Sequence, residues 1–553
     1  MTNNFFKNFK INNLYILIFF LSYFIFGIFL IQDYGISWDE SAERMHGFIS
    51  GNYVLEKILP EETYFKLFEG IINSRFNDLN HLEAPKLMEH GDRAYGVFFE
   101  LPMALLEIVI GFDEIKNVYL FRHYVTFSIF FIGTIYFYRY LNIIFNSPSI
   151  ALLGCLFLIS SPRIFAESFY NSKDIIFLSI FNISNYYGIN LLMKKNLNNS
   201  ILFSLSIAAL TSFRVIGLLV PILYLFLAIR EYFLTKNINI IKIFFLTLLL
   251  FTFFLVLFWP FLWENPVGNL IYVISHFASR LQNQEMLYLG GEVISSDLPW
   301  HYLFVWIIVS NPFHITIFSI SGIIIFFVNF FFKNKFLSTN YNFLKLSILL
   351  IYLIIPFSTF ILLRPDIQSG WRHFFFLLPS IIVFALICIN FLIREMNIKM
   401  IRNFVYFFVF VSLLHTLVWS VKNHPHQYVY FNNFIYKKKL INFFDKDYWG
   451  LSNKQLIDFI IENYKDEKIY YDHSNSSNIY LSLNNLNKID RKRFIKKENM
   501  PKDTKYYFYF FNNANKAPFE KQKKIMLLNN KNEIVKDIVV DGNSINTLYK
   551  IYN

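Results

Sequence analysis

The chain has 553 residues, of which 55% are hydrophobic, 20% aromatic and only 16% charged. This composition excludes an ordinary soluble globular protein and indicates a polytopic membrane protein. The formal net charge of +12 does not point to nucleic acid, because basic residues in such a chain usually mark loops that stay in the cytoplasm. Cys155 and Cys388 lie inside apolar runs, so neither a disulfide framework nor a thiolate metal site is indicated.

The first apolar run, residues 13–31, is too long for the core of a secretory signal and lacks a small-residue cleavage site, so it predicts an uncleaved span. The N-terminus is expected in the cytoplasm, which makes residues 32–120 a large outer loop. Within this loop the apolar stretch 97–111 carries Glu100 and Glu107. Because carboxylates are costly in a spanning helix, we expect this stretch to lie at the membrane interface.

Further apolar runs are long enough to cross the membrane. They cover about residues 121–143, 148–162, 175–193, 199–213, 216–229, 243–262, 311–332, 344–362, 374–393 and 403–421. Basic residues such as Arg139, Lys194 and Arg394 follow alternate runs and assign those helix ends to the cytoplasm. The prediction is therefore a mainly α bundle of about 11 spans, with a second outer loop at 263–300 and the C-terminus outside.

The last part of the chain has no run that could span a membrane. Short alternating runs at 468–473, 505–511 and 533–540 predict strands of a small α/β domain. We therefore expect a transmembrane domain over residues 1–436 and a soluble extracytoplasmic domain over residues 437–553. The lysine-rich surface of the second domain indicates either a solvated face or a docking surface for an acceptor.

The conspicuous polar clusters all fall in segments predicted to lie on the outer face. They are WDESAE (38–43), EHGDRAYG (89–96), AESFYNSKD (166–174), Arg214, LPWHY (298–302), RPDIQSGWRHF (364–374) and HPHQYVYFN (424–432). Clusters that are distant in sequence but share one face can converge into a single site. Scattered solvated loops would show no such bias.

Asp39 is the first candidate catalytic residue. The preceding span and Trp38 supply the apolar surroundings that tune a carboxylate toward general-base work. Glu43 is equally well explained as a solvated loop carboxylate. Asp174, next to Lys173 at the start of a predicted span, is either part of the site or a helix cap.

Arg214 lies between two short apolar segments, where a guanidinium needs an anionic partner or a water-filled cavity. A phosphate suits it, because the planar fork can donate two parallel hydrogen bonds. Arg372 and His373 form a second cationic group. Together with the carboxylates, these cations describe a site in which a base deprotonates a hydroxyl while a lipid-linked phosphate leaves. His301 is a weaker candidate, because an interfacial ring with satisfied hydrogen bonds explains it slightly better.

These clusters resemble the GT-C superfamily of integral-membrane glycosyltransferases, both in their order along the chain and in their predicted location on the outer face of the membrane. The matching segments are the acidic pair 39–40, EHGDRAYGVFFELP, the Lys-Asp pair 173–174, TSFRVIG (211–217), PWHY, GWRHFFFLLP, HPHQYVYFN and DKDYWGLS. Over about residues 1–452 the chain is most similar to bacterial relatives of the protein O-mannosyltransferases and of the lipid A aminoarabinose transferase. The resemblance implies a polyprenyl-phosphate sugar donor, no nucleotide sugar, and a lipid, glycan or protein acceptor on the outer face of a bacterial inner membrane.

The resemblance also implies roles for single residues. Asp39 would be the catalytic base, Glu40 its acidic neighbour and Asp174 the acid of the second outer loop. Arg214 stands where the family places a basic residue against the donor phosphate. The remaining residues expected to bind substrate are Lys173, His301, Arg372, His373, Glu89 and His90.

Glu89 and His90 occupy the stretch where the mannosyltransferases carry a His-Pro-Pro segment and the aminoarabinose enzyme a metal-linked glutamate. The sequence here, MEHGDRAYG, lacks those prolines. A divalent metal ion is therefore an open question as a cofactor, and nothing in the sequence requires one.

Two other classes of protein share part of this pattern. A transporter or flippase of a lipid-linked saccharide would also be polytopic and basic, but transporters usually show inverted repeats and place charges inside the bundle. The sequence shows no internal repeat, and its polar residues gather at one face. A non-catalytic scaffold would explain the C-terminal region but not Asp39, Asp174 and Arg214 together.

Overall fold

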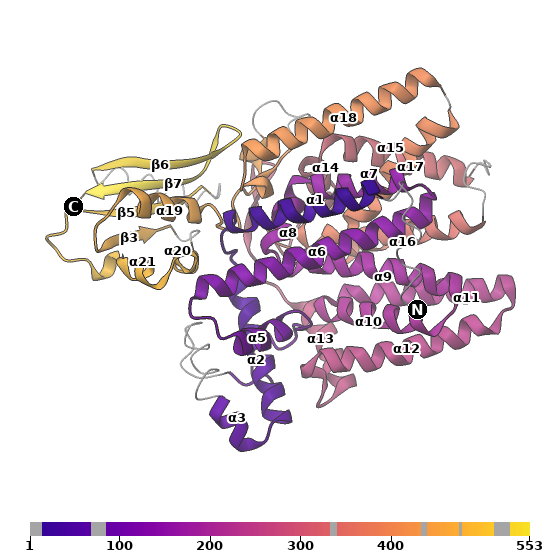
Figure 1. Ribbon diagram of the computed structural model, residues 1–553, viewed down its shortest axis with the longest axis horizontal. Helices are drawn as coiled ribbons and strands as arrows, with labels where there is room; N and C mark the ends of the chain where they lie inside the picture. The colour runs from indigo at the N-terminus through magenta and orange to yellow at the C-terminus, as the bar shows by residue number, and fades with distance from the viewer. Residues whose placement is uncertain are drawn as a thin grey trace.

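The computed structural model describes residues 14–67, 85–331, 340–396, 398–432, 440–474, 478–513 and 531–552. Within these residues a bundle of long apolar helices makes up most of the chain, and a small sheet lies at one end of the bundle (Figure 1). The fold is mainly α, as the composition predicts. Residues 68–84 of the predicted first outer loop lie outside the described residues.

The helices that precede the C-terminal sheet lie in the first three quarters of the chain. They are α1 (Leu14–Leu30), α2 (Glu40–Ile58), α3 (Glu61–Leu67), α5 (Glu100–Ile110), α6 (Ile115–Phe145), α7 (Pro148–Ser160), α8 (Pro162–Tyr170), α9 (Asp174–Lys194), α10 (Leu197–Phe213), α11 (Leu219–Thr235), α12 (Ile238–Phe258), α13 (Pro266–Ser279), α14 (Tyr302–Ser310), α15 (Phe313–Phe331), α16 (Asn340–Leu363), α17 (Leu378–Asn390) and α18 (Lys399–Lys422). The 3-10 helices η4 (Val215–Leu218) and η7 (Arg372–Leu377) lead into α11 and α17.

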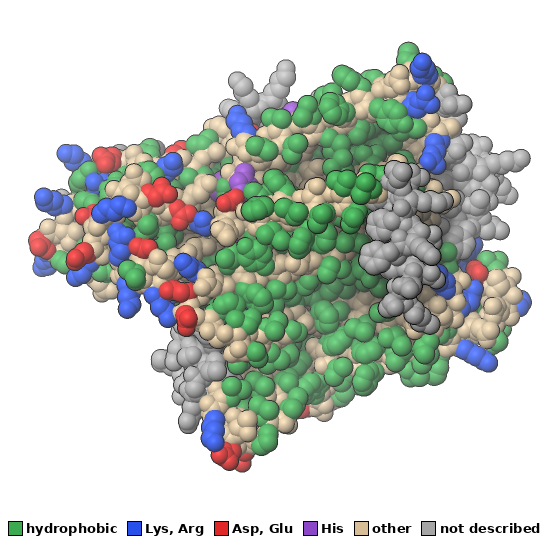
Figure 2. All heavy atoms as spheres, viewed as in Figure 1, with side chains coloured by type: hydrophobic (Ala, Val, Ile, Leu, Met, Phe, Trp, Pro, Cys, Tyr) green, Lys and Arg blue, Asp and Glu red, His purple; other side chains and the backbone are tan. Residues whose placement is uncertain are grey.

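The chain is an integral membrane protein by the length and apolar character of its helices. In the described residues seven helical stretches can cross a membrane, and the pair α7 and α8, bent by 71°, would add an eighth. Figure 2 shows exposed apolar side chains along the visible face of the bundle, with charged side chains on the C-terminal region and basic ones at the opposite end of the helices. Three other predicted spans correspond to shorter apolar helices, Leu197–Phe213, Phe313–Val328 and Tyr352–Leu363, so the total of about 11 spans stays a prediction.

The bend between α7 and α8 has a local cause. Pro162 has no backbone N–H and is placed at the start of α8, while the preceding Ser161 is extended with φ −68° and ψ 111°. The run predicted as a span at 148–162 therefore corresponds to α7, and the chain bends where that run ends. Beyond the bend, Glu167 of α8 accepts a hydrogen bond from the hydroxyl of Tyr448, in the segment that precedes the C-terminal sheet.

The stretch expected at the membrane interface forms α5, and its two carboxylates are paired inside the protein. Glu107 accepts hydrogen bonds from Arg44 of α2, with Nε to Oε2 at 3.0 Å, and Glu100 is paired with Arg122 of α6. All four side chains are buried. These ion pairs link α5 to α2 and α6. Because each carboxylate has a cationic partner, it can be buried in an apolar helix.

The predicted second outer loop is more ordered than its sequence indicates. It contains α13 and a hairpin of β1 (Glu285–Tyr288) and β2 (Gly291–Ile294), whose turn places Gly290 at φ +82°. Helix α14 follows it, and the sequence does not predict this helix because nine residues are too few for a membrane span.

The C-terminal sheet has five strands in the order β4-β3-β5-β7-β6. They are β3 (Ile469–His473), β4 (Phe494–Lys496), β5 (Tyr506–Asn512), β6 (Asn532–Val540) and β7 (Asn543–Tyr552), joined with helices α19 (Asn453–Asn463), α20 (Ile479–Ser482) and α21 (Lys488–Arg493). Strand β3 is parallel to β4 and β5, and β7 is antiparallel to β5 and β6. The three alternating runs form β3, β5 and β6, which confirms the predicted α/β character.

Candidate functional site

A cavity of about 620 Å³ opens at the sheet end of the bundle. Its charged and ionisable lining comprises Asp39, Glu43, His46, Asp92, Lys173, Arg214, Arg280, Asp366, Arg372 and His373. Apolar residues of α10, η4, α11, α13 and η7 form much of the remaining lining, among them Ile222 of α11. Because Ile222 is itself 59% exposed on a helix long enough to span the membrane, the cavity reaches the surface that faces lipid.

Asp174 lies behind the cavity wall and forms ion pairs with two arginines that line the cavity. Its Oδ1 atom accepts a hydrogen bond from Nη2 of Arg214, and its Oδ2 atom accepts one from Nη1 of Arg372 at 3.3 Å. The same Nη1 atom of Arg372 donates to Oδ2 of Asp39 at 2.8 Å. Four charged residues from four separate segments therefore form one chain of ion pairs, in which Asp174 is fully buried and Asp39 is 35% exposed.

The backbone explains why Arg214 reaches the cavity. It follows α10 in an extended conformation, with φ −151° and ψ 134°, so the helix ends there and η4 begins. The loop that carries Asp92 packs closely against the end of α10, next to Arg214. A Cβ on Gly96 of this loop would lie only 1.8 Å from the carbonyl oxygen of Ser212. Only glycine permits this approach of the loop to the end of α10.

A second group of charges lines another part of the cavity. Nζ of Lys173 lies 2.5 Å from Oε1 of Glu43 and 3.9 Å from the ring centroid of Tyr95. The ring of His46 stacks on the ring of Tyr95, and its Nε2 atom lies 3.7 Å from Oδ2 of Asp92. Glu43, which the sequence left as an ambiguous loop carboxylate, is thus buried within the site.

Two carboxylates favour the protonated ring of His46 when no metal ion is bound. Burial alone would lower the pKa of this ring, but Asp92 and Glu43, 3.7 and 3.9 Å from its two nitrogens, outweigh burial and raise the pKa to about 9. His46 in turn holds the pKa of Asp92 well below its usual range. Lys173 keeps the pKa of Glu43 low despite the burial of that carboxyl. The group therefore stays charged at neutral pH.

The predicted site residues divide into three sets. Asp39, Lys173, Arg214, Arg372 and His373 line the cavity, and Asp174 lies directly behind it. Glu40, Glu89, His90 and His301 are not among the described lining residues.

Glu40, Glu89 and His301 each have a local partner instead. The Oε1 atom of Glu40 accepts from the backbone N–H of Ser37 at 2.6 Å, and its Oε2 atom lies 2.9 Å from Nε2 of His123. Glu89 is exposed, with its carboxylate 3.7 Å from the ammonium of a nearby lysine. His301 is hydrogen-bonded through Nδ1 to the hydroxyl of Tyr288 at 2.6 Å. Trp38, expected to surround Asp39, is 45% exposed, and the group that contacts the Asp39 carboxylate is Arg372.

One cluster in the described residues has ligand atoms for a metal ion. His46, His90 and Asp92 each offer one atom, and these atoms all lie within 4.8 Å of one another. Two imidazoles and a carboxylate form a donor set that Zn²⁺ takes in proteins. Glu89, to which the resemblance pointed, is turned to the surface and does not belong to this cluster.

Sequence reasoning gave no role to the residues that support the cavity from the C-terminal side. The ring of Trp449 lies over the guanidinium of Arg372, and the hydroxyl of Tyr448 donates to Oε1 of Glu167 at 2.8 Å. The other oxygen of Glu167 accepts from Asn171 at 2.7 Å, and the same Asn171 amide donates to Asp174 at 3.1 Å. Their only signal was that they fall in segments that carry the resemblance, AESFYNSKD and DKDYWGLS.

No known protein family and no curated protein matches this sequence. Among solved structures, ArnT from Cupriavidus metallidurans in the apo state is similar with a TM-score of 0.50 at 8% sequence identity, over 97% of this chain and 98% of that chain. ArnT from the same organism bound to undecaprenyl phosphate matches with a TM-score of 0.44 at 9% identity, over 96% and 97% of the two chains. The likeness to the apo structure shows that the chain shares the fold of that ArnT along nearly its whole length.

Proposed function

We propose that this protein is a membrane glycosyltransferase that moves a sugar from a polyprenyl-phosphate donor to a hydroxyl acceptor. One observation carries the proposal: Arg214 and Arg372 converge with the carboxylate of Asp39 on a single cavity that reaches the lipid-facing surface. The fold shared with ArnT and the sequence resemblance to the GT-C superfamily support it. We further propose that the enzyme lies in a bacterial inner membrane with its N-terminus in the cytoplasm, and that residues 437–553 form an extracytoplasmic domain.

The donor phosphate would bind between the two arginines. Each guanidinium can donate parallel hydrogen bonds to phosphate oxygens, and Asp174 fixes both side chains by pairing with them. Asp174 and Asp39 together balance the two guanidinium charges, so directed hydrogen bonds and not net charge would hold the phosphate. The Nε atoms of Arg214 and Arg372 have no hydrogen-bond partner among the described residues and are left to donate. The apolar lining around Ile222 would hold the first units of the prenyl chain, which the opening toward lipid allows to enter sideways.

Asp39 would act as the general base. Among the described residues its carboxylate is paired only through Oδ2, with Arg372, and its side chain is partly exposed. The carboxylate would take the proton of the acceptor hydroxyl as that oxygen attacks the anomeric carbon. The bond from this carbon to the phosphate oxygen breaks in the same step, and the phosphate leaves with the electron pair. A single displacement of this kind inverts the anomeric centre.

Arg372 would connect the base to the leaving group, because one guanidinium contacts Asp39 and also lines the proposed phosphate site. Glu40 would act as a positioning residue, since its pairing with Ser37 and His123 fixes the turn that presents Asp39. His46, His90 and Asp92 are the residues that would hold a divalent ion. Such an ion, when bound, supplies positive charge beside the cavity, and no step above depends on it.

The test is transfer by the purified full-length protein in vesicles that contain a radiolabelled polyprenyl-phosphate sugar. We expect release of polyprenyl phosphate when acceptor lipids and glycans from the native envelope are present. Mass spectrometry of the envelope from a deletion strain identifies the missing sugar, and Asp39→Asn should fail to restore it. Direct use of a nucleotide sugar by the purified protein would end the proposal, and so would a fully restored sugar in the Asp39→Asn strain.

A further inference from the structure

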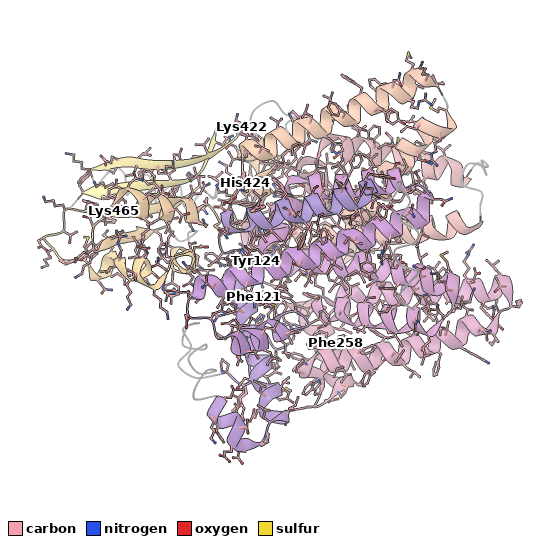
Figure 3. The ribbon with its side chains drawn as sticks, in the orientation of Figure 1. Phe121, Tyr124, Phe258, Lys422, His424 and Lys465 are labelled. Carbon is pink, nitrogen blue, oxygen red and sulfur yellow. The ribbon has the colours of Figure 1, made fainter. Side chains whose placement is uncertain are left out.

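A second cavity lies apart from the proposed transfer site. It has a volume of about 400 Å³ and is formed by the end of α18, the loop after it, α19 and β6. Figure 3 labels two of its lining residues, Lys422 and His424, where the helical bundle meets the C-terminal region. None of its lining residues takes part in the site described above.

The cavity begins where an apolar helix surface ends. Large apolar side chains are exposed along α18 up to its last turn, with Leu417 58%, Val418 58% and Val421 68% exposed. Lys422 follows at once and lines the cavity. Because α18 is long and apolar enough to span a membrane, this change from apolar to polar surface marks the depth at which lipid headgroups lie.

The charges around the cavity are of both signs. Lys422 and Lys536 supply ammonium groups, and Asp458, Glu462 and Asp537 supply carboxylates. Asp458 is paired with Lys454 at 2.9 Å, and Asp537 accepts hydrogen bonds from β7. The ammonium of Lys536 lies 5.3 Å from the centroid of the Phe459 ring. Lys422 and Glu462 are exposed and have no hydrogen-bond, ion-pair or ring partner among the described residues, so this cation and this anion are left for a ligand.

Both histidines of the cavity have partners within the protein. His424 is engaged by Asp33 at 2.8 Å and by Gln427 at 2.9 Å. The Nε2 atom of His426 lies 3.0 Å from Gln455, and burial lowers the pKa of this ring. A ligand for the cavity therefore needs one negative group for Lys422 and one positive group for Glu462.

We propose that this cavity binds the headgroup of phosphatidylethanolamine, with its phosphate on Lys422, its ammonium on Glu462 and its acyl chains along the exposed face of α18. The headgroup carries both charges a few atoms apart. Its primary ammonium can donate hydrogen bonds to a carboxylate, whereas a choline group has no N–H to donate and a glycerol group has no positive charge. A lipid bound there would also bridge α18 to α19 and β6.

The test uses the full chain, purified and titrated with lipids of identical acyl chains while retained lipid is measured by native mass spectrometry. We expect phosphatidylethanolamine to bind about tenfold more tightly than phosphatidylcholine or phosphatidylglycerol, the factor typical of one charge-assisted hydrogen bond. Glu462→Gln should remove the preference over phosphatidylcholine. Lys422→Gln should weaken binding of all three lipids.

Lys465→Gln is the matched control, because Lys465 is exposed in the C-terminal region and does not line the cavity (Figure 3). It should leave every affinity unchanged. Soluble glycerophosphoethanolamine forms a further arm and should fail to displace the lipid. Equal binding of the three lipids, or an unchanged preference in Glu462→Gln, would overturn the proposal, and displacement by the soluble headgroup would reassign the cavity to a water-soluble ligand.

Discussion

The ring of Trp449 lies 4.7 Å, measured to its centroid, from the guanidinium carbon of Arg372. Both side chains are buried, and Trp449 belongs to the segment between α18 and α19. The part of the chain that follows the last apolar helix therefore contributes directly to the order of an arginine in the proposed phosphate site. Tyr448 adds a second contact through Glu167, which leads by way of Asn171 to Asp174.

Loss of the Trp449 ring should weaken donor binding. A cation–π contact contributes about 0.5 to 2 kcal/mol, so Trp449→Ala should raise the KM for the donor by about 2- to 30-fold. Trp449→Phe keeps an aromatic face and should recover most of that loss. Trp300→Ala is the control, since Trp300 is 64% exposed and does not line the cavity. Equal kinetic constants for Trp449→Ala and Trp449→Phe would contradict a role for the ring face.

Asp39 and Glu40 should differ in what their substitution damages. Asp39→Asn keeps shape but not basicity, so turnover should fall by about 10² to 10⁴ while donor binding remains. Glu40→Gln weakens a buried pair with His123, and should lower the free energy of unfolding by about 1 to 3 kcal/mol. Turnover measurements and thermal unfolding in detergent separate the two effects. A catalytic loss of the same size in both variants, with unchanged stability, would refute the distinction.

Charge reversal at Arg214 should abolish donor binding. Arg214→Glu places a carboxylate beside Asp174 and removes one fork of the phosphate site, so binding of a polyprenyl phosphate in nanodiscs should fall below detection. Arg364→Glu is the matched control, because Arg364 is 65% exposed and pairs with Asp297 at the surface. The variant proteins should both be found in the membrane fraction. Normal lipid binding by Arg214→Glu would exclude it from the site.

His46 should make stability depend on pH. Its pKa of about 9 is above the ordinary value of 6.5, so the charged ring favours the folded state. This contribution is complete below pH 6.5 and is lost as the pH rises through 9; its full size is about 3 kcal/mol. The stability gap between the wild type and His46→Gln should therefore shrink over that window. Asp92 and Glu43 stay ionised throughout it, because their pKa values are lowered. A gap that is constant from pH 6 to 10 would show that the ring is neutral in the fold.

The predicted orientation can be tested by labelling single cysteines in intact cells. The two native cysteines are buried, so background labelling should be low. Cysteines at Glu62, Asp297 and Asp503, all exposed, should react from outside, and one at Asn198 should be protected. Protection of the Asp503 position alone would mean that the span count is wrong by one.

The sequence was most informative where one residue breaks a strong pattern. Arg214 interrupts an apolar stretch, and the structure ends α10 there for the backbone reason given above. The alternating runs likewise predicted β3, β5 and β6, because period-two alternation over several residues has few other structural solutions.

The sequence could not show in which direction a side chain points, nor which residues distant in sequence are in contact. Asp39 and Glu40 are neighbours, yet one lines the cavity and the other is buried against His123, because helix α2 begins between them and turns the second side chain away. The contact of Trp449 with Arg372 joins segments far apart in the chain, and no local pattern encodes such a pairing. The location of the charged clusters on one predicted membrane face indicated that they converge, but it did not indicate which residues are in contact.

The position of Trp449 also sets an order of assembly for the molecule. A ribosome makes Asp174, Arg214 and Arg372 before it makes Tyr448 and Trp449. During that interval the nascent protein already holds the cations of the cavity, while the aromatic ring over Arg372 is still missing. A premature stop after α18 should therefore leave a chain that has its apolar helices but lacks the ring that packs on Arg372.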